Sequence, residues 1–193
     1  ASVVLDLAVG LADLHGQGVA LGGFGPAAIA VVEAENEIAR ALFVELSEVV
    51  TVDEGLSVHP YLREMPLAYR SADREEDAPT PRAADIFSLA SLCYELGTGI
   101  RASTSPEGDA EVEGWFRGEG PRPVCSVAST SPDLPAEFGM LIQRCMARTT
   151  ASRPSDMTQF IRGLAVVVDA AFTSRASAPG VVSLRERIDA ALA

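Results

Sequence analysis

The sequence predicts a mainly α-helical domain with a small β-hairpin and one long irregular loop. Three observations support this fold class. Apolar residues recur every three or four positions in several segments, which is typical of amphipathic helices. Two short apolar runs flank a polar segment, as in a hairpin, and residues 47–81 are rich in charge and poor in apolar periodicity. With 193 residues, 48% of them hydrophobic, the chain is long enough to bury a single core.

The N-terminal part is expected to begin with a helix and continue into the hairpin. The helix should end at Gly16, and a glycine-rich loop should follow over residues 16–28. The apolar runs 29–32 and 41–46 then form the hairpin, and residues 47–81 form mostly loop. The apolar residues at helical spacing in the first helix are Val4, Leu7, Leu11 and Leu14.

The C-terminal part is expected to be helical. Residues 83–96 form a strongly apolar central helix that ends at the glycines after it, and residues 111–117 form a short helix. The segment 131–133 (SPD) should cap a helix that carries residues 138–146, and Ser155 should open a helix that extends to Val168.

The organisation predicted from these elements is one domain and a tail. Residues 1–173 form the domain and residues 174–182, which are small and include Pro179, form a linker. Residues 183–193 form a short amphipathic helix, because residues 183–186 (SLRE) match a capping box.

Charge and residue usage narrow the functional classes. The net charge of −12 argues against nucleic acid and against anionic membranes as partners, and is easier to reconcile with a neutral or basic protein partner. The chain contains no lysine, which excludes a Walker-type phosphate lysine, a Schiff-base lysine and a kinase-type nucleotide lysine within it. Cys93, Cys125 and Cys145 are expected to be buried free thiols, which favours the cytoplasm.

No cofactor or metal site is predicted. Residues 23–28 (GFGPAA) match a dinucleotide fingerprint in spelling, but that motif needs a strand before it and a helix after it. Here the predicted order is the reverse. His15 and His59 lack partners at metal-ligand spacing, so His15 is expected to be a structural residue at a helix end and His59 a loop residue. No stretch approaches the ~20 apolar residues that a membrane-spanning helix needs.

The order of the elements resembles the C-terminal lobe of protein kinases, over about residues 3–172. The loop over residues 47–81 then resembles an activation segment. The strings that carry the resemblance are residues 11–19 (LADLHGQGV), 68–73 (AYRSAD), 84–90 (ADIFSLA), 94–99 (YELGTG), 141–146 (LIQRCM) and 152–155 (SRPS). Each string is weak alone, and their order makes the set specific.

The chain departs from the kinase pattern at the residues that carry catalysis. By the resemblance, Gly23 replaces the aspartate base, Gly25 the loop lysine and Ala28 a metal-binding asparagine. Residues 48–50 (EVV) replace the Asp-Phe-Gly triplet, so that Glu48 alone keeps a carboxylate. A general base contributes about 10² to 10⁴ in rate and the metals stabilise the transferring charge. The resemblance therefore implies that the chain is not an enzyme.

Three residues match architectural positions of the family. The resemblance implies that Asp85 holds the backbone of the degenerate catalytic loop and that Arg153 pairs with Asp73. The alternative for Asp85 is an ordinary acid in the first turn of a helix.

These observations together predict a non-catalytic pseudokinase module that acts as a protein-interaction scaffold or allosteric partner. Two alternatives stay open: a kinase fragment completed by an N-terminal lobe from elsewhere, and a structural subunit of a large assembly. The expected interaction surfaces are the loop over residues 47–73, Trp115 with Phe116, and the terminal helix. Trp115 suits a core anchor as well as a binding hot spot. The apolar stripe of the terminal helix, which packs on its own domain or on a partner, consists of Leu184, Ile188 and Leu192.

Overall fold

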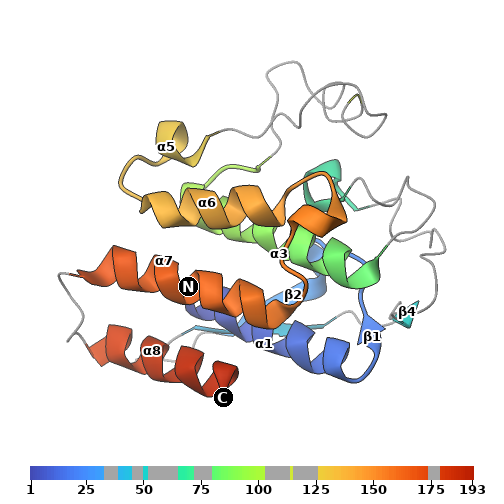
Figure 1. Ribbon diagram of the computed structural model, residues 1–193, viewed down its shortest axis with the longest axis horizontal. Coiled ribbons are helices and arrows are strands. Elements are labelled where there is room, and N and C mark those ends of the chain that lie inside the picture. Colours follow the sequence, from blue (N-terminus) through green and yellow to red (C-terminus); the bar gives the residue numbers. More distant parts are fainter. Residues whose placement is uncertain are drawn as a thin grey trace.

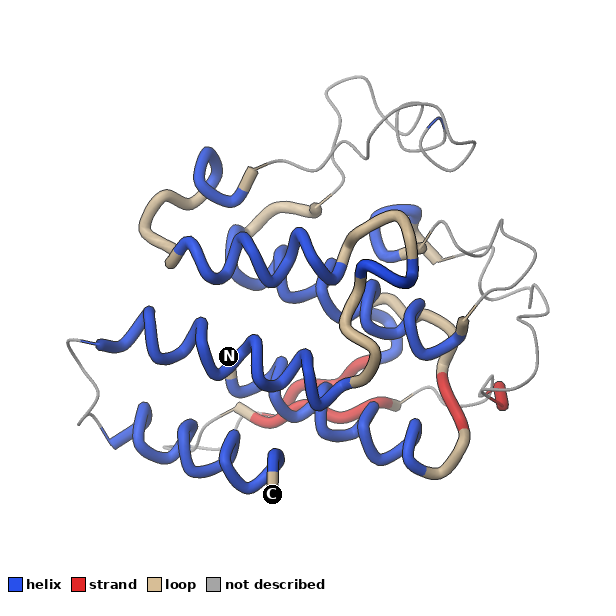
Figure 2. The backbone as a smooth tube through the Cα atoms, in the orientation of Figure 1, coloured by secondary structure: helices blue, strands red, loops and turns tan. Residues whose placement is uncertain are grey.

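A computed structural model describes residues 1–32, 39–44, 50–51, 65–71, 80–102, 114, 126–173 and 179–193. In this part of the chain helices predominate, and the strands form two small antiparallel sheets (Figures 1 and 2). The mainly helical fold class is confirmed. The helices and strands, in chain order, are α1 (Ser2–Gly16), β1 (Val19–Ala20), β2 (Ile29–Val32), β3 (Arg40–Phe43), β4 (Val50–Thr51), α3 (Pro81–Thr98), α5 (Val127–Thr130), α6 (Ala136–Cys145), α7 (Met157–Phe172) and α8 (Pro179–Leu192).

Helix α1 forms where the apolar spacing predicts it. Val4, Leu7 and Leu11 are buried in the core, and Leu14 is partly buried against it. The helix contacts strand β3, helix α3 and helix α7. It therefore lies at the centre of the packing.

Strands β2 and β3 form the predicted hairpin, in antiparallel register from Ile29 opposite Phe43 to Val32 opposite Arg40. Phe43 packs toward α1, where Gly10 leaves room for its ring, and meets the ring of Phe24 edge to face at a centroid distance of 5.0 Å. The second strand begins one residue earlier than expected and ends at Phe43. The other sheet, β1 with β4, was not predicted.

Helix α3 is the most deeply buried element. Its residues from Ala83 to Tyr94 are all buried, and it packs against α1 and α6. Pro81 starts the helix, a position where its missing N–H costs nothing. The helix ends at Thr98 and is capped by Gly99, whose φ of 75° is left-handed and whose N–H donates to the Glu95 carbonyl.

Gly97 of α3 lets α6 approach closely, and alanine there is expected to lower the free energy of unfolding by about 2 kcal/mol. A Cβ at this position would lie 2.7 Å from Cζ and 3.1 Å from Cε1 of the buried Phe138 ring. Urea denaturation measures the loss. Gly16→Ala is the matched control, because a Cβ there has no neighbour within 4 Å. Equal stability of the two variants would contradict the close approach.

Helices α6 and α7 begin at different residues from those predicted. Residues 131–133 lie in a turn, in which the Leu134 N–H donates to the Ser131 carbonyl, and α6 starts only after Pro135. Asp156, rather than Ser155, caps α7, because its carboxylate accepts from the Gln159 N–H at 2.9 Å. Burial acts to raise the Asp156 pKa, but this N–H and the Ser155 hydroxyl outweigh it and hold the pKa below its ordinary value.

Helix α8 starts at Pro179, so Ser183 lies inside the helix and does not cap it. The predicted linker 174–182 and the helix boundary at 183 are corrected accordingly, with residues 174–178 outside the described part. Leu184 and Ile188 are buried in the core, and Leu192 is partly buried against it. The helix packs on α7 and α1. Its apolar stripe therefore packs on its own domain and does not form a free interaction surface.

Cys93 of α3 and Cys145 of α6 are buried free thiols, as predicted, whereas Cys125 lies outside the described residues. Burial raises the pKa of each thiol to about 12. In the described part of the chain, no helix is long and apolar enough to cross a membrane.

Candidate functional site: the loop held by Asp85

The segment between β1 and the 3-10 turn Pro26–Ala28 occupies the position predicted for the degenerate catalytic loop. Gly22 and Gly23 have φ angles of 70° and 106°. This left-handed backbone is easily adopted by glycine and costs other residues about 1–2 kcal/mol. Leu21 and Phe24 are buried, so the loop directs its large side chains into the core.

Asp85 is fully buried and binds this loop through its backbone. Its Oδ1 accepts from the Gly23 N–H at 2.7 Å and its Oδ2 accepts from the Leu21 N–H at 3.0 Å. The imidazole Nε2 of His15, which is also buried, lies 2.9 Å from the same Oδ2. A carboxylate only accepts, so Nε2 carries the proton in this contact. Three donors thus compensate for the burial of one carboxylate.

Ser88 lies one helical turn after Asp85 and extends the attachment. Its hydroxyl accepts from the Phe24 N–H at 3.1 Å and donates to the Tyr69 carbonyl at 2.8 Å. The Tyr69 hydroxyl donates to Glu95, and burial together with this carboxylate raises the pKa of Tyr69. Helix α3 therefore holds both the loop and the 3-10 turn Leu67–Tyr69.

Arg153, which follows the 3-10 turn Thr150–Ser152, is buried among backbone carbonyls. Its Nε donates to Ala147 at 2.8 Å, its Nη1 to Ala83 at 3.0 Å, and its Nη2 to Arg148 at 3.2 Å. The guanidinium carbon lies 5.1 Å from the centre of the Phe87 ring, within range of a cation–π contact. Arg153 thus ties the start of α3 to the segment between α6 and α7.

The structure brings some of the predicted site residues together and leaves others undescribed. Asp85 and Gly23 are in direct contact, and Ala28 is buried in the hydrophobic core. The pairing of Arg153 with Asp73 stays a prediction, because Asp73 lies outside the described residues. The same holds for the roles assigned to Glu48, Trp115 and Phe116.

Sequence reasoning missed two features of this region. The partner of His15 was not predicted, and neither was the role of Ser88. A signal for Ser88 exists, because positions 85 and 88 share one helix face at i, i+3 spacing and both are polar within an apolar run. Among the described residues, no three histidine, cysteine, aspartate or glutamate side chains gather in a way that could hold a metal ion.

Solved structures of protein kinases resemble this chain. The autoinhibited serine kinase domain of the giant muscle protein titin has a TM-score of 0.64 and 15% identity, with coverage of 84% of this chain and 48% of that chain. A structure of titin kinase with its flanking domains has a TM-score of 0.62 and 17% identity, covering 82% and 28%. The Cydia pomonella granulovirus kinase PK-1 has a TM-score of 0.64 and 13% identity, covering 83% and 55%.

These likenesses establish the fold. The chain has a protein-kinase-like fold, and it spans about half or less of the kinase structures that it matches, as expected for a C-lobe-like domain. The predicted C-lobe-like architecture is therefore confirmed. No protein-family profile matches the sequence, and no curated protein does.

Proposed function

We propose that this protein is a non-catalytic pseudokinase module of the cytoplasm that binds protein partners as a scaffold or an allosteric component. The observation that supports this function is the contrast within the loop at residues 21–28. Asp85 and Ser88 hold its backbone in place, while the side chains of this segment include no acid, base or amide.

The backbone conformation and packing of the loop fit the glycine and the alanine that stand at positions 23 and 28. At Gly23 the backbone has a φ of 106°, which an aspartate would adopt only with strain. The methyl group of Ala28 is buried, so an asparagine amide at that position would need partners inside the core. The replaced positions are thus part of the packing, which supports a role in which the fold rather than the chemistry is used.

A nucleotide-binding measurement tests the proposal. Melting of the purified chain in saturating ATP or ADP with Mg²⁺ is expected to match melting with Mg²⁺ alone. A ligand at a hundred times its Kd would add about 2.7 kcal/mol, which raises the Tm of a domain this size by roughly 5–10 °C. A rise of that size would contradict the proposal.

The same measurement addresses a second candidate, a kinase fragment that another segment completes. The observation that favours it is the length of the match. This chain covers only 48% of one kinase chain that it matches and 55% of another. A nucleotide-dependent rise in Tm would support this candidate. The net charge of −12 suits a neutral or basic protein surface as the partner under either proposal.

A further inference from the structure

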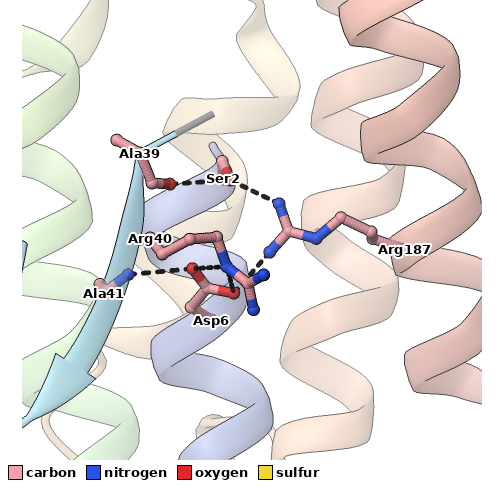
Figure 3. Close-up of polar contacts among 6 residues, drawn as sticks. All are labelled: Ser2, Asp6, Ala39, Arg40, Ala41 and Arg187. Atoms are coloured by element: carbon pink, nitrogen blue, oxygen red, sulfur yellow. Dashed lines mark hydrogen bonds and ion pairs between the residues drawn. The ribbon is translucent and has the colours of Figure 1, made fainter. Parts of the chain in front are cut away.

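Asp6 of α1 is a buried carboxylate that three elements share (Figure 3). Its side chain is 7% exposed. From the hairpin, the Arg40 Nε donates to both of its oxygens at 3.1 and 3.0 Å, and the Ala41 N–H donates to Oδ2 at 3.0 Å. From the C-terminal helix, Nη2 of Arg187 donates to Oδ1 at 2.5 Å.

A second path joins the same elements. Nη1 of Arg187 donates to the Ser2 hydroxyl at 2.5 Å, and that hydroxyl donates to the Ala39 carbonyl at 3.3 Å, directly before β3. Figure 3 shows the guanidinium of Arg187 reaching from α8 to both side chains of α1, with the start of β3 on the opposite side. Helix α8 and the start of β3 thus both bond to Ser2 and Asp6, two groups of α1 that lie between them.

We propose that Asp6 couples the docking of α8 to the position of the β2–β3 hairpin, so that release of α8 loosens the start of β3. While α8 is docked, the Asp6 carboxylate is largely shielded from water, and its partly buried bond to the Ala41 N–H acts at a lower local dielectric than a surface contact does. When α8 leaves, water reaches the carboxylate and competes for the same donors, as it does at exposed ion pairs.

The coupling is reciprocal by thermodynamic linkage, so a change in the hairpin alters the docking of α8 by the same factor. The hairpin and the residue that follows it expose four apolar side chains, each about half accessible to solvent: Val31, Val32, Leu42 and Val44. Helix α8 therefore controls the placement of an apolar surface to which it does not belong. The coupling would operate whether the module is catalytic or a scaffold.

Hydrogen exchange in the full chain tests the coupling. In Arg187→Gln, the Ala41 N–H is expected to exchange about tenfold faster, which corresponds to ~1.4 kcal/mol, because this N–H donates directly to Asp6. Amides of α6, which is remote from the network, should be unchanged. Unchanged exchange at Ala41 alongside faster exchange in α8 would overturn the proposal.

Arg185→Ala is the matched control. It removes an arginine from the same helix, but Arg185 pairs with Asp169 and Asp189 on the surface and not with Asp6. This variant should leave the exchange of Ala41 as it is, and an acceleration equal to that of Arg187→Gln would reduce the effect to general loosening of α8 and overturn the proposal.

A variant on the hairpin side, Arg40→Ala, tests the coupling if Arg187→Gln fails to fold. Arg40→Ala changes a side chain that is 65% exposed on the hairpin, so it is expected to fold and to accelerate exchange in the middle of α8. Normal protection of α8 in this variant would refute the coupling.

Discussion

Alanine in place of Asp85 is expected to lower the free energy of unfolding by about 3–5 kcal/mol, as the loss of one partner from a buried charged network does. The substitution leaves the Leu21 and Gly23 N–H groups and the Nε2–H of His15 without their acceptor in the core. Each orphaned donor costs about 1–3 kcal/mol. Since single domains have only about 5–15 kcal/mol in total, the variant should unfold at a much lower urea concentration.

Two further variants make this result specific. Asp169→Ala removes a carboxylate that is 60% exposed and pairs with Arg185 at the surface, so its effect should stay within about 0.5 kcal/mol. Asp85→Asn keeps one acceptor oxygen and should lie between the wild type and the alanine variant. A loss below about 1 kcal/mol in Asp85→Ala would show that solvent satisfies the loop, contrary to its buried geometry.

Replacement of Arg153 by alanine is expected to destabilise the domain by about 3 kcal/mol. The change removes the donors to three carbonyls and the group that covers the Phe87 ring. Lysine should rescue little, because an ammonium group cannot reproduce the planar fork of the guanidinium. Thermal and urea denaturation both measure the loss, and an unchanged Tm would contradict the role of Arg153 in joining α3 to the segment before α7.

Arg144→Ala supplies the control for charge and size. Arg144 lies on the exposed side of α6 and donates to Gln159 at the surface, so its replacement should be nearly neutral. A double-mutant cycle between positions 73 and 153 tests the predicted ion pair, for which a coupling energy above about 0.5 kcal/mol is expected. Additive losses would instead assign the whole effect to the backbone carbonyls.

The long helices were predictable because burial imposes a period on the sequence. The apolar faces of α1, α3 and α7 recur at three or four residues, and all three form. The short elements lack such a signal. Strands β1 and β4 have two residues each. Helix α8 starts at Pro179, and the sequence did not reveal this start because proline suits the first turn of a helix as well as a linker. The capping-box pattern at residues 183–186 therefore predicted a start for α8 that is four residues too late.

Residues of the candidate site could be predicted where they match a position in the kinase pattern. Contacts between residues far apart in the sequence could not be predicted. The assignment of Asp85 to the degenerate loop came from its place in residues 84–90. Asp6 offered only a weak signal, as an acid interrupting the apolar start of α1. Its partners are 34, 35 and 181 residues away, and pairing over such separations leaves no periodic trace in a single sequence.

The burial of Cys93 and Cys145 has a kinetic consequence. Since burial raises the pKa of both thiols to about 12, these two cysteines offer almost no thiolate at neutral pH, and the thiolate is the form that alkylating reagents attack. Modification of either sulfur must wait until α3 and α6 separate. In a Cys125→Ser background, the rate at which Cys93 and Cys145 are alkylated would therefore measure how often the centre of the domain opens.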